Sequence, residues 1–136
     1  MQLITYLPPQ NVAGLHLVEG LRALDGMVER FTFENMTSLV AHLRRPLGTS
    51  SICILVPADN PELSRLVAIR HLLRDMRIVL ILPDGNAETV SEGHFLRPRY
   101  VTYADDPVSD ITQVVRKMIG RVQRPGMAPG MVPGMV

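Results

Sequence analysis

Short apolar runs alternate with helical patterns along the first 122 residues of the chain. The runs cover residues 3–7, 28–33, 51–56, 77–82 and 100–103. Three of them are continuously apolar, which is typical of strands that are covered on both faces of a parallel sheet. The run 28–33 mixes polar and apolar residues, so we expect it nearer an edge. The pattern predicts five strands.

Helix signals fill the segments between these runs. Asn60-Pro61-Glu62 combines an N-cap, a proline in the first turn and an early acid, so we expect one helix to begin there and continue towards the fourth run. Asp106-Pro107 opens the last helix, which has a regular apolar stripe. The segment 87–95 has little apolar content and is the weakest of the predicted helices.

Strand and helix in fivefold alternation predict right-handed crossovers with helices on both faces of the sheet. We therefore expect a flavodoxin-like three-layer α/β fold with a parallel sheet in the order 2-1-3-4-5. The alternative is half of a Rossmann-like fold with another strand order. Residues 1–122 form the predicted domain.

A different composition follows in residues 123–136. Pro125, Pro129 and Pro133 each begin a Pro-Gly-Met unit, and proline at every fourth position prevents a helix. This repeat predicts either a flexible tail or a segment that docks in a groove of its own or a neighbouring molecule.

Composition narrows the possible partners and compartments. The net charge of +1 lacks the basic excess of a typical nucleic-acid-binding protein. Cys53 is the single cysteine and lies in an apolar run, so we expect a buried thiol without disulfide or metal. With no secretory or membrane-spanning pattern, the chain is expected to be cytoplasmic, without membrane contact. The four histidines are scattered, and we expect them at the surface or its boundary.

Carboxylates follow several of the predicted strands, at the edge where ligands bind in this kind of sheet. They are Asp59, Asp84, Asp105 and Asp106. One hypothesis is a divalent-metal or small-ligand site at this acidic edge. The other is that Asp59, Asp84 and Asp106 cap the helices that follow. No glycine-rich phosphate loop is present, and Pro8-Pro9 removes two backbone donors, so no cofactor is expected.

Three features resemble the receiver domain of bacterial response regulators over residues 1–122. The segment 32–43 is similar to the second strand and helix of that family. Pro61 stands where a proline follows the phosphorylated aspartate by four residues, and Asp106-Pro107 stands where the family usually has Lys-Pro. The resemblance implies a receiver-like fold.

The same alignment places no phosphorylation chemistry in this chain. Pro57 occupies the position of the phosphorylated aspartate, Pro83 follows the fourth strand in place of the serine or threonine, and Asp106 replaces the lysine. Leu7-Pro8-Pro9 replaces the acidic pair that holds Mg²⁺. We therefore expect a pseudo-receiver that is not an enzyme and acts as a protein–protein interaction module in bacterial signal transduction.

Two surfaces are candidates for partner contact. The resemblance points to the last strand and helix, with Tyr100, Tyr103, Arg116 and Arg121, as the face for a protein partner or a homodimer. A second set of arginines could contact an acidic partner or nucleic acid, or simply form a solvated helix face: Arg44, Arg45, Arg65, Arg70, Arg74 and Arg77.

Overall fold

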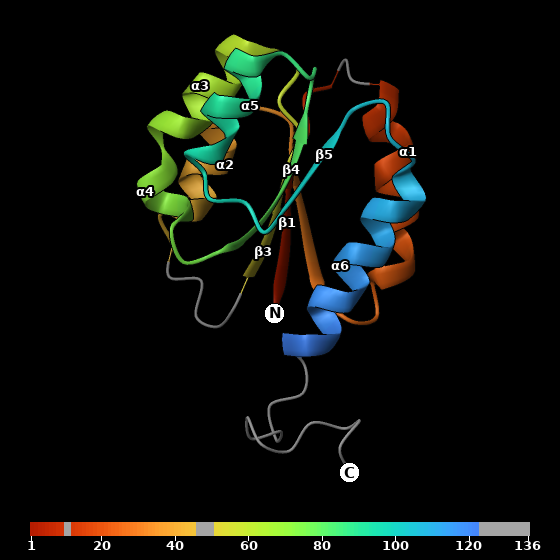
Figure 1. Ribbon diagram of the computed structural model, residues 1–136. Coiled ribbons are helices and arrows are strands. Elements are labelled where there is room, and N and C mark those ends of the chain that lie inside the picture. Colours follow the sequence, from red (N-terminus) through yellow and green to blue (C-terminus); the bar gives the residue numbers. More distant parts are fainter. Residues whose placement is uncertain (10–11, 46–50, 123–136) are drawn as a thin grey trace, which may run out of the picture.

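The computed structural model describes residues 1–9, 12–45 and 51–122 (Figure 1). Its parallel sheet has the order β2-β1-β3-β4-β5, with strands β1 (Gln2–Tyr6), β2 (Glu29–Phe33), β3 (Ser51–Leu55), β4 (Arg77–Leu82) and β5 (Tyr100–Tyr103). The helices are α1 (Val12–Leu21), continued by the 3₁₀ turn η1 (Arg22–Leu24), then α2 (Met36–Leu43), α3 (Asn60–Ala68), α4 (Arg70–Leu73), α5 (Ala87–His94) and α6 (Val108–Val122). The Pro-Gly-Met repeat predicted for 123–136 lies outside the described residues.

The strand order and the flavodoxin-like fold predicted from the apolar runs are confirmed. Every residue of β3 is buried, as its unbroken apolar run indicated. β2 lies at the edge of the sheet and is the most exposed strand, in agreement with its mixed pattern. An unbroken apolar run therefore corresponds to a strand that is covered on both faces, and a mixed run to a more exposed strand.

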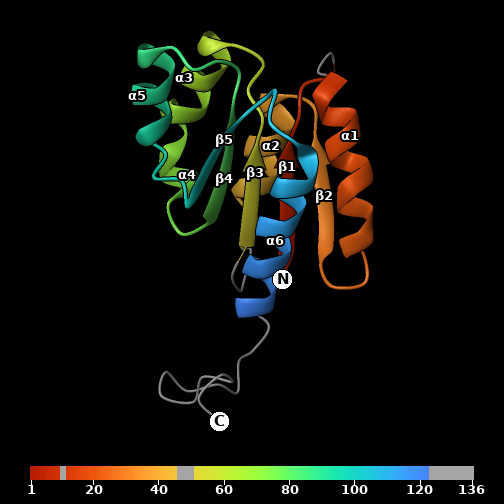
Figure 2. The ribbon, with the colours of Figure 1, turned by 45° about the vertical axis from the view of Figure 1, so that its right-hand side comes forward.

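Two helical layers enclose the sheet. Figures 1 and 2 show α1 and α6 on one face and α2, α3, α4 and α5 on the other. In β3, Ile52 and Ile54 pack in the core on the α1/α6 side, whereas Cys53 and Leu55 pack in the core on the opposite side. Each such side chain contributes roughly 1.5–3 kcal/mol through burial. No helix of the described residues has the length and apolar character needed to cross a membrane.

The segment after β3 differs from the prediction at two points. Asp59, rather than Asn60, is the N-cap: its Oδ1 accepts the N–H of Glu62 at 2.9 Å, so Asn60 and Pro61 already lie inside the helix. The single expected helix is also divided into α3 and α4. Ile69 breaks it with a ψ of 17°, and the N–H groups of Ile69 and Leu72 bond three residues back instead of four.

Cys53 and His42 are titratable side chains that lie buried in the core. Cys53 is fully buried, as predicted, and burial raises its pKa to about 12, which keeps the thiol unreactive. His42 is also buried, contrary to the expectation of a surface or boundary residue. Its Nε2 lies 2.9 Å from Gln2 Oε1, and its ring packs against Phe31 and Phe33. Burial lowers the pKa of His42.

Candidate functional site

The central strand of the sheet ends at Pro57. Tyr6 of β1 is in register with Leu55 of β3, and Leu55 is in register with Leu80 of β4. Val56 extends this pairing, since its N–H donates to the carbonyl oxygen of Tyr6 at 3.0 Å. Pro57 follows immediately and is buried. It therefore lies at the middle of the carboxyl edge, where ligands bind in doubly wound sheets.

The residues beside Pro57 are also unreactive. Leu7 and Pro8, which follow β1, are buried, and Pro83, which follows β4, is half-buried. The N–H of Leu7 donates to the carbonyl oxygen of Phe33 at 2.8 Å, so this backbone group is already occupied. None of these four side chains offers a nucleophile or a metal ligand.

The side chain of Asp106 points back towards β5, the strand that precedes it. Its Oδ2 accepts hydrogen bonds from the hydroxyl of Thr102 and from the N–H of Tyr103, the latter at 2.9 Å. These two bonds lower the pKa of the Asp106 carboxyl. The prediction that Asp106 caps the next helix is therefore wrong: its carboxylate closes the end of β5. A charge held in this way cannot replace the phosphate-binding lysine of a receiver.

The capping hypothesis is confirmed for Asp59 but not for Asp84, because the N-cap of α5 is Asn86. Asp59 caps α3, and Glu62 in turn accepts the N–H of Ala58 at 3.0 Å, which resembles a capping box. Asp84 Oδ1 accepts the N–H of Asn86 at 2.9 Å in the turn that leads into α5. Asp59 therefore caps a helix, whereas Asp84 stabilises a turn.

Three of the predicted carboxylates line one open hollow between the β4 and β5 loops. Its volume is about 710 Å³, and Asp84, Asp105 and Asp106 contribute to its wall. Within the described residues, however, no three Asp, Glu, His or Cys side chains come together as a metal site requires. Two of the three are also held by their own loops. The acidic edge is thus a set of separate turn and cap contacts.

A contact between buried Tyr6 and Glu62 lies beneath this edge, and no local pattern in the sequence indicates it. Tyr6 is only 3% exposed, and its hydroxyl is hydrogen-bonded to Glu62. Burial, followed by the charge and hydrogen bond of Glu62, raises the pKa of Tyr6 to about 12. The phenol therefore stays protonated and joins β1 to the start of α3.

The two tyrosines of the face predicted around the last strand and helix lie on opposite sides of the sheet. Tyr100 packs against the core on the α1/α6 side, whereas Tyr103 packs against the core on the opposite side. Arg116 is exposed on α6, and the side chain of Arg121 lies outside the described residues. The two tyrosines point to opposite faces because they are an odd number of positions apart in a strand.

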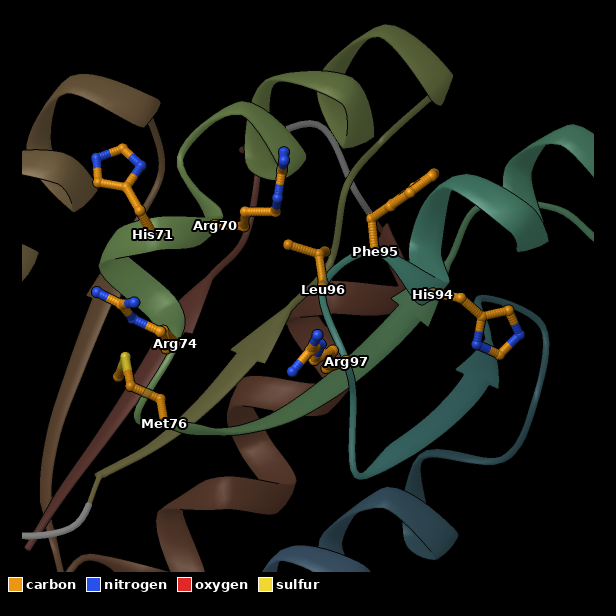
Figure 3. Close-up of a pocket in the computed structure, with 8 residues that line it drawn as sticks. All are labelled: Arg70, His71, Arg74, Met76, His94, Phe95, Leu96 and Arg97. Atoms are coloured by element: carbon orange, nitrogen blue, oxygen red, sulfur yellow. The ribbon is translucent and has the colours of Figure 1, made fainter.

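A basic hollow, which the sequence did not reveal as a site, lies between α4 and the turn after α5. Its volume is about 540 Å³. Figure 3 shows Arg70 on α4 and Arg74 directly after it on one side, with Phe95, Leu96 and Arg97 on the other. The guanidinium group of Arg74 and the ring of His94 extend outward, away from each other. Arg70 and Arg74 belong to the predicted arginine face, but Phe95 and Arg97 come from a different element.

Comparison with known proteins supports the fold alone. A crystal structure from Burkholderia pseudomallei, of a protein described as related to pilus assembly, is similar with a TM-score of 0.61. The match covers 88% of this chain and 90% of that one, at 11% sequence identity. No family model matches the chain, and no curated protein matches it by sequence.

This identity is too low to carry over the neighbour's role, but the coverage is informative. Nearly the full length of both chains superposes, so the likeness includes both helical layers as well as the sheet. The chain therefore shares a flavodoxin-like architecture with a protein of bacterial origin. Its function has to be argued from its own residues.

Proposed function

We propose that this chain is a receiver-like domain that accepts no phosphoryl group and acts as a protein–protein interaction module in bacterial signal transduction. The observation that carries the proposal is the place of Pro57, buried at the end of the central strand. A receiver needs a carboxylate nucleophile at that point. Proline supplies neither the nucleophile nor a backbone donor.

The neighbouring positions support the same conclusion. Leu7 and Pro8 provide no Mg²⁺ ligands, and the carboxylate of Asp106 is bonded to Thr102 and Tyr103. Restoring the usual receiver residue at any one of these positions would still leave the other groups needed for phosphoryl transfer absent. The proposal therefore includes no enzymatic activity and no cofactor.

The proposed partner is a protein, either a second copy or another component of the signalling or assembly system. The support for a protein partner is the exposed ring of Phe95, which lies beside a hollow lined by arginines. The small net charge of +1 favours neither nucleic acid nor an anionic membrane surface. The proposed location is the cytoplasm.

Phosphate-mimic titration tests the first half of the proposal. Isotope-labelled protein is mixed with Mg²⁺ and beryllofluoride, or with acetyl phosphate, and the amides of Ala58, Asp84 and Ala104 are followed by NMR. We expect no saturable shift at these strand ends, whereas a working receiver domain treated in parallel shifts. Saturable changes confined to this edge would contradict the proposal.

Affinity capture with surface variants tests the second half. Arg116→Glu reverses an exposed charge on α6, and Arg44→Glu makes the matched change on the opposite helical layer. If α6 contributes to the predicted face, the first variant loses a captured partner and the second retains it. Retention of all bound proteins by every surface variant, including those described below, would argue against a specific interaction module.

A further inference from the structure

Two hollows of opposite charge meet at Phe95. The basic hollow described above is lined by Arg70, Arg74 and Arg97, and the second hollow is lined by Glu88 and Glu92 of α5. Phe95 lines both. Its side chain is 61% exposed, more than any other large apolar residue that the structure describes. An exposed ring between two charged walls is an arrangement suited to contact with another macromolecule.

The charges on the basic side are not neutralised by any residue that the structure describes. Among the described residues, Arg70, Arg74 and Arg97 take part in no ion pair, although Arg70 donates to the carbonyl oxygen of Val67 at 3.1 Å. None of the residues that line this hollow is an acid. Its guanidinium groups are therefore available to external carboxylates.

Backbone geometry makes the basic hollow a poor site for a small phosphate compound. The N–H groups of Phe95, Leu96 and Arg97 all bond to carbonyls three residues earlier, at 3.0–3.1 Å. The turn follows the C-terminus of α5, and Arg97 closes it with a φ of 50°, so its bonded N–H groups offer no cradle to a phosphate. Recognition here has to come from side chains, which favours a protein surface with spaced carboxylates.

The chain itself carries such a surface, beside the same phenylalanine. A two-fold axis through the Phe95 region would place the basic hollow of one copy against the acidic hollow of the other, twice, with the two rings at the centre. We propose that Phe95 and its flanking hollows form the interface of a homodimer, an inference that rests on the proposed interaction function and names its surface and partner. The two hollows and Phe95 together form the Phe95 groove, which is separate from the α6 face that includes Arg116.

The architecture predicts how the dimer responds to its environment. The central rings exclude water and supply most of the affinity, while the Arg–Glu contacts at the rim set orientation and salt dependence. Raising the NaCl concentration from 50 to 500 mM shortens the electrostatic screening length severalfold. We therefore expect the dissociation constant of the dimer to rise about tenfold. A purely apolar interface would not weaken in this way.

Complementary charge reversal tests the pairing directly. One variant carries Arg70→Glu and Arg97→Glu, the other carries Glu88→Arg, and the molecular mass of each is measured by sedimentation equilibrium across a range of concentrations. We expect the wild type to dimerise and each variant alone to have a dissociation constant roughly tenfold higher. Their equimolar mixture should recover the wild-type dissociation constant. Phe95→Ser is expected to weaken all combinations.

The outcomes separate this inference from the broader proposal. A wild type that remains monomeric, or a mixture that does not recover, overturns the inference. A dimer that is broken by Arg116→Glu and unaffected by the groove variants also overturns it, yet leaves an interaction module. Failure of the broader proposal has a different signature, namely phosphate-mimic shifts at the sheet edge. If wild type binds an acidic peptide or nucleic acid through these arginines while staying monomeric, the homodimer is excluded.

Discussion

The carboxyl edge of the sheet and the groove around Phe95 use their polar groups in opposite ways. At the edge, Asp59, Asp84 and Asp106 each accept a backbone N–H from their own loop. In the groove, the guanidinium groups of Arg74 and Arg97 form no ion pair or hydrogen bond with another described residue. Three carboxylates of the edge thus have partners in their own loops, whereas Arg74 and Arg97 have none among the described residues.

This contrast shows why the position of a fold's usual active site is a poor guide here. The edge contains many carboxylates, but their partners lie within four residues in the sequence, so they stabilise turns. The groove is formed by α4 and the end of α5, which are distant in sequence and meet only in the folded chain. Unsatisfied charge beside exposed apolar surface is the more informative sign of a binding surface.

The largest effect is expected where α5, which carries the groove, packs on the sheet. A Cβ on Gly93 would lie 2.9 Å from a methyl of Leu80 and 3.1 Å from one of Leu82. We expect Gly93→Val to lower the free energy of unfolding by about 1–3 kcal/mol through overpacking. Gly120→Val on α6 is the matched control, since nothing lies within 4 Å of its Cβ position, and it should change stability by less than about 0.5 kcal/mol. Urea denaturation measures both, and equal losses would disprove close packing at Gly93.

An effect of similar size is expected at Glu62, which is bonded to both Ala58 and Tyr6. Glu62→Ala removes the acceptor of the Ala58 N–H and leaves the buried hydroxyl of Tyr6 without its partner. We expect a loss of about 1–3 kcal/mol in urea denaturation. In the Glu62→Ala background, Tyr6→Phe should cost less than it does in the wild type, because the unpaired hydroxyl is then removed. Independent, additive losses would show that the two residues do not interact.

The sequence contained enough information for the sheet, because strand burial follows from local composition. The continuous run of β3 and the mixed run of β2 predicted their central and edge positions without any long-range contact. The opposite orientations of Tyr100 and Tyr103 also follow from their spacing, so grouping them in one face neglected a signal that was present.

The site features were harder to predict because they depend on choices between chemically similar residues or on tertiary packing. Asp59 and Asn60 are both good N-cap residues, and the sequence does not show which of them has the extended backbone of an N-cap. Asp106 precedes a helix but bonds backwards to Thr102 and Tyr103. The exposure of Phe95 depends on how α5 packs against the sheet, which no local pattern describes.

A smaller effect is expected from the acid response of the edge. Because the pKa of Asp106 is lowered in the folded state, its carboxylate contributes stability above the unfolded-state pKa of about 4, and this is lost as the pH falls through the folded-state value. Asp106→Asn should therefore reduce the loss of stability between about pH 5 and pH 2. Asp105→Asn, which changes an exposed carboxylate of the same loop, is the control. Indistinguishable acid profiles for wild type and Asp106→Asn would refute the hydrogen-bonded arrangement.

The smallest effect on stability is expected in the groove. Phe95→Ser removes a ring that is 61% exposed, and Glu88→Arg changes an exposed side chain, so each should alter the monomer's free energy of unfolding by no more than about 0.5 kcal/mol. Urea denaturation at protein concentrations below the dissociation constant measures the monomer alone. If Phe95→Ser lowered the free energy of unfolding as much as Glu62→Ala, the ring would be part of the core. The contrast between an edge bonded within its own loops and a groove open to a partner would then disappear. A neutral result combined with loss of dimerisation would mean that Phe95 serves association, since folding alone gives no reason to keep a large apolar ring in water.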